Sequence, residues 1–423
     1  MNNFALKGDI LFSRTPTELA VFERHYAVCI DGVCAGVFPE LPERFAAIPV
    51  LDYTGKLIIP GLVDLHAHAP QYAFRALDMD LELLDWLDTQ TFPQEARYAD
   101  LSYAQTAYTI FADALRRSAT TRAVLFGTLH VPATRLLMEL LEQSGLETYV
   151  GKVNMDRNSP DCLCESDAAT SLAATRDWLD SCRSLTHCRP ILTPRFVPSC
   201  SDALMQGLGD LQRETGLSVQ SHLSENQGEI AWVRELCPQS TSYGDAYDRF
   251  GLFGGDGCPT IMAHCVWSDA DERALMKRNG VFIAHCPQSN TNLSSGIAPV
   301  RTFLREGLSV GLGSDIAGGV HLSIFRAMAD AVQVSKLRWR LCDQSLPPLT
   351  LPEAFFLGTR GGGAFFGKVG AFEPGYAFDA LVLDDADLPC PFALTPEQRL
   401  TRIIYLSDDR AVQNKFVDGR KLF

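Results

Sequence analysis

The sequence predicts an α/β protein: a (β/α)8 barrel of the TIM type with a small β-rich domain formed from both chain termini. Between about residues 57 and 336, eight short runs of β-branched and aliphatic residues alternate with amphipathic helical patterns. This alternation indicates parallel strands, because a helix must return the chain to the start of each next strand. The flanks instead carry short extended runs broken by Gly and Pro. A chain of 423 residues is long enough for one such barrel and a small companion domain.

The elements follow from these runs in chain order. We expect the eight barrel strands at residues 57–66, 121–127, 147–155, 189–196, 217–222, 260–266, 281–285 and 309–315. Apolar residues at helical spacing predict helices between them, including residues 133–143, 168–180, 201–215, 227–236, 269–278 and 300–305. Extended runs in the flanks lie at residues 8–12, 27–30, 33–37, 380–383 and 415–417. The predicted division is therefore 1–56 and 371–423 for the small domain and 57–370 for the barrel.

Charge and composition exclude several classes of protein. Lys and Arg number 37 against 51 Asp and Glu, a net charge of −14, which argues against a nucleic-acid or anionic-membrane partner. No apolar run approaches the roughly 18 residues that span a bilayer, and the start of the chain lacks a signal-peptide pattern. The thirteen cysteines are an odd number scattered through apolar or helical stretches, as in reduced proteins. We therefore expect a cytoplasmic protein.

Polar side chains recur at the carboxyl ends of the predicted strands, where barrel enzymes place their active sites. The first strand ends in Asp-Leu-His-Ala-His, and the period of two puts both imidazoles on one face. Neighbouring imidazoles suit zinc or ferrous iron. Of nine histidines, five lie at predicted strand ends, so that the joint pattern predicts a metal site. They are His66, His68, His222, His264 and His285.

Taken singly, these residues also have structural interpretations. A lone His at a strand end is more commonly a hydrogen-bonded core residue than a ligand, and Asp315 after the last strand is equally suited to capping. The roles of His285, His130 and His321 stay open. The sequence around Trp86 is interpreted as core packing.

At these residues the chain resembles the amidohydrolase superfamily of metal-dependent barrel hydrolases. The matching pieces are the segment Pro-Gly-Leu-Val-Asp-Leu-His-Ala-His at residues 60–68, then His222, His264 and Asp315. Within that superfamily the chain resembles the guanine deaminases, whose characteristic segments occur in order. They lie at residues 68–72, 194–196, 221–226, 285–290 and 313–319. The departures are mild: Ser314 stands where Thr is familiar, and Gln288 where Asn is common.

The resemblance implies a reaction and a cofactor. His66, His68, His222 and Asp315 would hold one zinc ion per chain, with ferrous iron as the alternative. A metal-bound hydroxide would then deaminate guanine to xanthine and ammonia in a homodimeric enzyme. Members with two metals commonly bridge them with a Lys on the fourth strand. Here that strand ends in Arg-Phe and the nearest Lys, Lys152, lies in the third, which favours one metal.

The resemblance also distributes roles in the reaction. Glu225 would shuttle protons, His264 would hydrogen-bond the reacting oxygen, and Asp315 would orient the water. Arg195 offers paired donors to the carbonyl oxygen and N7 of guanine. The residues expected to contact the substrate are Gln71, Arg195, Phe196, His222, Glu225 and Asp315.

Two other readings of the sequence remain open. A related deaminase acting on another purine, a pyrimidine or a triazine would keep the same metal site. A non-catalytic purine-binding scaffold would have kept the fold alone. The presence of every residue named for the metal and for proton transfer disfavours the scaffold.

Overall fold

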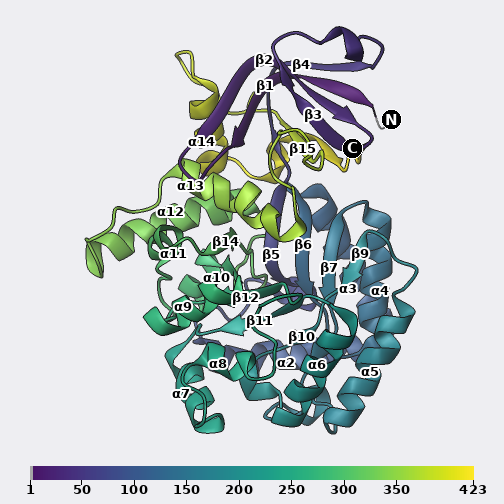
Figure 1. Cartoon of the computed structure of the whole chain (residues 1–423), viewed down its shortest axis with the longest axis vertical. Coiled ribbons are helices and arrows are strands. Elements are labelled where there is room, and N and C mark those ends of the chain that lie inside the picture. Colours follow the sequence, from purple (N-terminus) through teal and green to yellow (C-terminus); the bar gives the residue numbers. More distant parts are fainter. Residues whose placement is uncertain (1–2) are drawn as a thin grey trace.

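A computed structural model describes residues 3–423, so the first two residues of the predicted small domain lie outside the described part. Parallel strands form a barrel surrounded by helices, and a separate sheet lies across one end of it (Figure 1). The predicted fold class, a barrel of the TIM type with a sheet built from both termini, is confirmed. None of the helices in this range combines the length and hydrophobicity needed to cross a membrane.

Each of the eight predicted runs contains a barrel strand. Two parallel sheets, β5-β6-β7-β9 and β11-β12-β13-β14, make up most of the wall, and a short parallel pair, β8 and β10, extends it. An isolated bridge between Leu192 and Val219 joins the two halves, and the Asp315 N–H donates to the His66 carbonyl at 2.8 Å on the other side. The strands are β5 (Leu62–His68), β6 (Thr120–Phe126), β7 (Glu147–Gly151), β8 (Val153–Asn154), β9 (Cys188–Pro190), β10 (Thr193–Pro194), β11 (Val219–Leu223), β12 (Thr260–His264), β13 (Phe282–His285) and β14 (Ser309–Leu312).

Helices cover the outside of the barrel. All six predicted helices are present, and α6 shows why such predictions succeed: the Ser201 hydroxyl caps its first turn and Gly216, at φ 68°, ends it. The helices are α1 (Leu83–Trp86), α2 (Phe92–Ala96), α3 (Leu101–Arg117), α4 (Val131–Ser144), α5 (Ala168–Ser181), α6 (Asp202–Thr215), α7 (Gln227–Leu236), α8 (Tyr243–Asp248), α9 (Ala270–Asn279), α10 (Pro287–Asn292), α11 (Val300–Glu306), α12 (Ile324–Leu341), α13 (Leu351–Phe356) and α14 (Pro396–Leu406).

The terminal sheet joins strands from both ends of the chain in the order β17-β16-β15-β4-β1-β2-β3. β1 and β4 are parallel, whereas their other neighbours pair antiparallel. The sheet brings the N- and C-terminal segments together above the barrel (Figure 1). Its strands are β1 (Phe4–Ser13), β2 (Leu19–Ile30), β3 (Val33–Phe38), β4 (Val50–Pro60), β15 (Ala380–Leu383), β16 (Val412–Val417) and β17 (Arg420–Lys421).

The first predicted strand, residues 57–66, turned out to be parts of two strands. Residues 57–60 end β4 in the terminal sheet, and β5 begins the barrel after Gly61. A Cβ on Gly61 would lie 2.2 Å from the Thr121 hydroxyl, so only glycine lets the chain pass this close to β6. Because the apolar residues run without a break, the sequence shows no sign of the change from one strand to the next. The domain division 1–56, 57–370 and 371–423 stays a prediction, with β4 running across its first boundary.

Charged side chains join the terminal sheet to the barrel, at a place we call the junction (Arg122, Asp379, Lys415 and Asp418). The first three are buried, and Asp418 is partly exposed. Arg122 of β6 donates to both carboxylate oxygens of Asp379, at 2.7 and 3.2 Å, and to Asp418 at 2.5 Å. The Lys415 ammonium, fully buried in β16, donates to three carbonyl oxygens at and just beyond the end of α3, at 3.0–3.4 Å. Every one of these charged groups has a partner in the protein.

Candidate active site and metal centre

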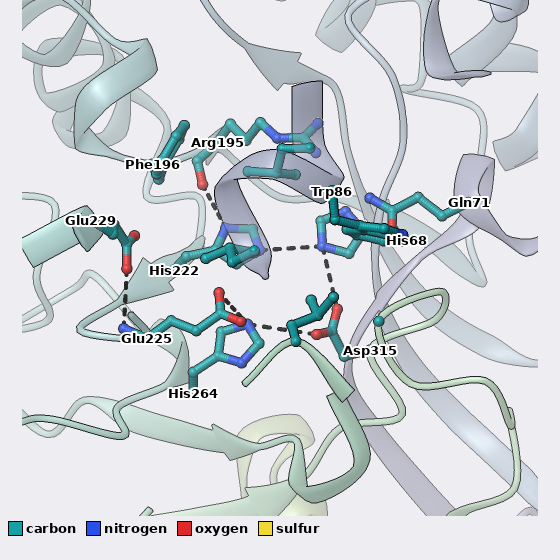
Figure 2. Close-up of a pocket in the computed structure, with 14 residues that line it drawn as sticks. His68, Gln71, Trp86, Arg195, Phe196, His222, Glu225, Glu229, His264 and Asp315 are labelled. Atoms are coloured by element: carbon teal, nitrogen blue, oxygen red, sulfur yellow. Dashed lines mark hydrogen bonds and ion pairs between the residues drawn. The ribbon is translucent and has the colours of Figure 1, made fainter. Parts of the chain in front are cut away.

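A cavity opens at the carboxyl ends of the barrel strands. Figure 2 shows polar side chains from several strand ends turned toward one another within it. Eight of the nine predicted site residues line this cavity, and the ninth, His66, lies directly beside Asp315. The lining residues are His68, Gln71, Leu83, Trp86, Leu87, Arg195, Phe196, His222, Glu225, Glu229, His264, Leu293, Asp315 and Gly318.

Four donor atoms gather at one place on the wall of the cavity. The Nε2 atoms of His68 and His222 lie 3.2 Å apart. Asp315 Oδ1 lies 3.2 Å from His66 Nε2 and 3.5 Å from His68 Nε2. Ligands bonded at about 2.0–2.1 Å to a tetrahedral ion lie about 3.3 Å from one another. The spacing of these donors therefore fits a divalent metal ion.

Hydrogen bonds turn the imidazoles toward this place. The Nδ1–H of His222 donates to the Arg195 carbonyl oxygen at 2.7 Å, so the lone pair of its other nitrogen faces the cluster. The Nε2 atom of His66 is buried and has no hydrogen-bond partner within residues 3–423. A buried ring nitrogen without a partner is costly unless a ligand satisfies it. The site is thus a buried His/Asp metal centre.

The charges of the cluster suit metal binding. Burial and the neighbouring His66 hold the pKa values of His68 and His222 well below the usual range, which leaves both rings neutral at physiological pH. Burial opposes ionisation of Asp315, but the surrounding imidazoles hold its pKa well below that of an ordinary Asp. Neutral imidazoles and an ionised carboxylate are the forms in which these side chains ligate metals.

Strained backbone aims the side chains at the strand ends. Ser224, His264 and Asp315 have φ values of 46°, 73° and 46°, in the left-handed region that non-glycine residues rarely adopt. The buried carboxylate of Asp64 helps to fix this shape. It accepts the backbone N–H of His66 at 3.1 Å and both the N–H and the hydroxyl of Ser314, at 3.0 and 2.5 Å. Asp64 thereby ties the end of the first barrel strand to that of the last.

A carboxylate suited to proton transfer lies beside the metal donors. Oε2 of Glu225 is 3.4 Å from His264 Nε2, and the Ser295 hydroxyl donates to Oε1 at 3.1 Å. Burial, with a smaller effect from the charge of Asp315, raises the pKa of Glu225 to about 8. The Nδ1–H of His264 donates to Asn290 Oδ1 at 2.8 Å, which leaves Nε2 facing the cavity.

Comparison with known proteins agrees with this geometry. A model of the Amidohydrolase family matches residues 57–422. Guanine deaminase of Dictyostelium discoideum is 39% identical over 382 residues, covering 88% of this chain and 84% of the relative. Guanine deaminase of Escherichia coli (strain K12) is 34% identical over 386 residues, covering 89% and 85%. A crystal structure of guanine deaminase from C. acetobutylicum, with bound guanine in its active site, has a TM-score of 0.96, 46% identity and full coverage of both chains.

The chain belongs to the guanine deaminases of the amidohydrolase family. The resemblance inferred from the sequence is confirmed, as is its assignment to the hydrolases. The alternative of a non-catalytic purine-binding scaffold that kept only the fold is no longer supported.

Several residues of this guanine deaminase site were not found from the sequence. Glu95 contacts both Gln71 and Arg195. Glu229 accepts the backbone N–H of Glu225 at 3.1 Å and the Tyr243 hydroxyl at 2.7 Å. Burial, with a smaller effect from Glu225, raises the pKa of Glu229 to about 7. Their only sequence signal was the position of Glu229 on the predicted helix that follows the His222 segment.

The structure also places Trp86 and the three histidines whose roles were left open. Trp86 packs against Phe74, as expected, but it also lines the cavity. His285 lies at the end of β13 with both ring nitrogens buried and without hydrogen-bond partners among the described residues. None of His285, His130 and His321 is among the described residues that line the cavity.

Proposed function

We propose that this protein deaminates guanine to xanthine and ammonia, using one zinc ion per chain held by His66, His68, His222 and Asp315. The observation that carries the proposal is that three of these donors share one cavity with Glu225, Gln71 and Arg195 (Figure 2). The fourth, His66, lies beside Asp315. A divalent ion at this site brings the pKa of a coordinated water toward about 7 and so supplies the nucleophile.

A single ion agrees with the surroundings of the nearest lysine. Lys152 is buried and forms an ion pair with Glu165, and it is not among the described residues that line the cavity. It is therefore not placed to bridge a second metal. Ferrous iron would suit the same donors, and elemental analysis of the purified protein distinguishes the two ions.

Glu225 is the proton carrier in this proposal. Its raised pKa, about 8, lies close to working pH, which is where a side chain both accepts and donates protons well. It would take one proton from the attacking water and deliver it to a ring nitrogen. It would then pass the second proton of that water to the amino group, which leaves as ammonia while the water oxygen becomes the new carbonyl. The Ser295 hydroxyl holds one carboxylate oxygen while the other faces the reacting atoms.

His264 and Asp315 act on the reacting oxygen. Nε2 of His264 lies 3.4 Å from the nearer oxygen of Glu225 and 3.7 Å from Asp315 Oδ2, so the three groups surround one small space. There His264 stabilises the oxygen that becomes negative during attack, and Asp315 orients the water. His222 borders the same space from β11.

The other side of the cavity recognises the base. Arg195 donates to the carbonyl oxygen and ring nitrogen of guanine, which present acceptors together on one edge. Gln71 carries both a donor and an acceptor for the ring nitrogens near the reacting carbon. Phe196, 6% exposed on the cavity wall, contacts the base with its ring or its backbone N–H. Adenine presents an amino donor beside N7 where guanine presents a carbonyl oxygen, so this pair of donors disfavours adenine.

Two further points belong to the proposal. The excess of acidic residues and the reduced cysteines support a cytoplasmic enzyme, and the family resemblance supports a homodimer. Sedimentation at several protein concentrations measures the oligomeric state directly, and a single species at the mass of one chain would refute the dimer.

The deciding experiment measures turnover by the purified, zinc-loaded protein. We expect guanine to yield xanthine and ammonia in equal amounts, with kcat/KM far above that for adenine, cytosine or a chloro-triazine. Elemental analysis should find one metal per chain. Metal-loaded protein that prefers another of these bases would keep the reaction type and overturn the substrate.

A further inference from the structure

One buried carboxylate lies behind the cavity and contacts both side chains assigned to the base. Glu95, on α2, is 2% exposed. Its Oε2 accepts from Arg195 Nη1 at 2.6 Å, and its Oε1 accepts from Arg195 Nη2 at 3.2 Å and from Gln71 Nε2 at 2.8 Å. Among the described residues, Gln71 and Arg195 line the cavity whereas Glu95 does not. Glu95 therefore reaches a bound base only through these two side chains.

Glu95 determines which way the amide of Gln71 points. An ionised carboxylate only accepts hydrogen bonds, so the amide nitrogen of Gln71 must face Glu95. On the other side the Ala317 N–H, which only donates, bonds the amide oxygen at 3.0 Å. The two contacts select the same orientation. Gln71 thus presents its remaining N–H and its remaining lone pair to the cavity at fixed positions.

Glu95 also fixes the guanidinium of Arg195. The fork-like contact with both carboxylate oxygens holds the guanidinium plane, because a bidentate pair leaves little rotational freedom. Phe92, three residues before Glu95 on the same short helix, lies 5.0 Å from the guanidinium carbon. The remaining N–H groups of Arg195 are left for a ligand. The ion pair also supplies the countercharge that a buried guanidinium requires.

We propose that Glu95 is a positioning residue that sets the preference for a purine with a carbonyl oxygen and a ring N–H beside it. It does so by fixing the orientation of the Gln71 amide and the Arg195 guanidinium, the two groups that hydrogen-bond the base. This inference rests on the proposed function. A purely structural ion pair predicts instead that losing Glu95 weakens turnover of every substrate alike.

Two substrates separate these possibilities. Guanine has the carbonyl oxygen and the neighbouring N–H, whereas 2-aminopurine keeps the reacting amino group and lacks both. The measured quantity is the ratio of kcat/KM for guanine to kcat/KM for 2-aminopurine. Metal content and thermal unfolding are recorded for each variant, so that folding and metal loading are known.

The principal variant is Glu95→Gln, which keeps the shape but has one acceptor oxygen and no charge. If its oxygen takes the place of Oε1, its amide nitrogen faces Nη1 of Arg195, which is a donor. In the opposite orientation its amide nitrogen faces the donors of both Gln71 and Arg195. We expect kcat/KM for guanine to fall about 100-fold, the loss that misplacement by about an ångström produces. For 2-aminopurine we expect a change of less than about threefold, with the metal retained.

The matched control is Glu353→Gln. Glu353 is also buried, and it also forms a bidentate pair with one arginine, Arg301, but on α13 and outside the cavity lining. Its variant should keep the substrate ratio of the unaltered enzyme. Glu95→Asp keeps the charge while shortening the side chain by one methylene, and it decides the matter if Glu95→Gln fails to fold. We expect its ratio to fall about tenfold.

The outcomes are distinct. The inference is supported if the ratio of kcat/KM for guanine to that for 2-aminopurine falls in the Glu95 variants and stays at the value of the unaltered enzyme in Glu353→Gln. Equal losses for both substrates, or an unchanged ratio in the folded Glu95 variants, would overturn it while guanine turnover by the unaltered protein upholds the proposed function. Absence of guanine turnover by the unaltered, metal-loaded protein would overturn both.

Discussion

The junction and the metal centre, at opposite ends of the barrel, differ in whether their buried charged and polar groups have partners in the protein. At the junction, Arg122 meets two carboxylates and Lys415 meets three carbonyl oxygens. At the cavity, the Nε2 atom of His66 is buried without a hydrogen-bond partner among the described residues, and Glu225 faces His264 and Asp315 across a gap. Completed pairs hold a fold together, whereas donors and acceptors left incomplete are available to a ligand. Buried charged and polar groups thus serve stability at the junction and chemistry at the metal centre.

The largest effect is expected from a substitution in the cavity. Glu225→Gln removes the proton carrier while keeping its shape, so kcat should fall about 10³-fold, within the range for loss of a general acid or base. The metal should stay bound, because Glu225 is not among the four expected ligands. Burial raises the pKa of Glu225, so we expect that an uncharged amide in its place does not lower the unfolding temperature. Steady-state kinetics, elemental analysis and calorimetry measure the three quantities. A rate near that of the unaltered enzyme would exclude Glu225 as the carrier.

The next effect breaks the junction. Asp379→Ala leaves the guanidinium of Arg122 with only Asp418, and removing one partner of a buried pair reduces the free energy of unfolding by about 3–5 kcal/mol. Activity per folded molecule should remain within about twofold. Urea unfolding and kinetics on the same sample test both statements. A large loss of kcat with unchanged stability would mean that the two ends are not separate in function.

The smallest expected effect is the contribution of Lys415 to the pH dependence of the free energy of unfolding. Burial lowers the pKa of Lys415 to about 7 despite its hydrogen bonds, from an ordinary value of about 10.5. Between these values the folded protein binds fewer protons than the unfolded chain, so this group makes stability rise with pH. Relative to Lys415→Met, the unaltered protein should gain about 2 kcal/mol between pH 7 and 9. Urea unfolding at several pH values measures the difference, and parallel curves for the two proteins would contradict it.

How far the sequence predicts this molecule differs between its parts. The barrel strands were predictable because they depend on local pattern, and strand periodicity puts His66 and His68 on one face. The family resemblance, and not local pattern alone, implied that His222 and Asp315 complete the set of metal donors. Glu95 was not predictable, because it lies a hundred residues before Arg195 on a five-residue helix without an amphipathic pattern. The end of β4 was hidden because two consecutive buried strands form one apolar run. Local sequence patterns thus predict single strands and helices, whereas contacts between residues far apart in the sequence are seen only in the structure.

The position of β4 has a consequence for how the chain is made. Its partner β15 begins 320 residues after β4 ends, yet the two pair directly from Pro60–Ala380 onward. At about 5–20 residues per second, a ribosome needs roughly 16–64 s to supply that partner. Until then the hydrogen-bonding edge of β4 that β15 will cover stays open, and open strand edges invite pairing with other chains. During this period the nascent sheet depends on shielding from neighbouring chains. The period ends only when β15, which begins at Ala380, has emerged.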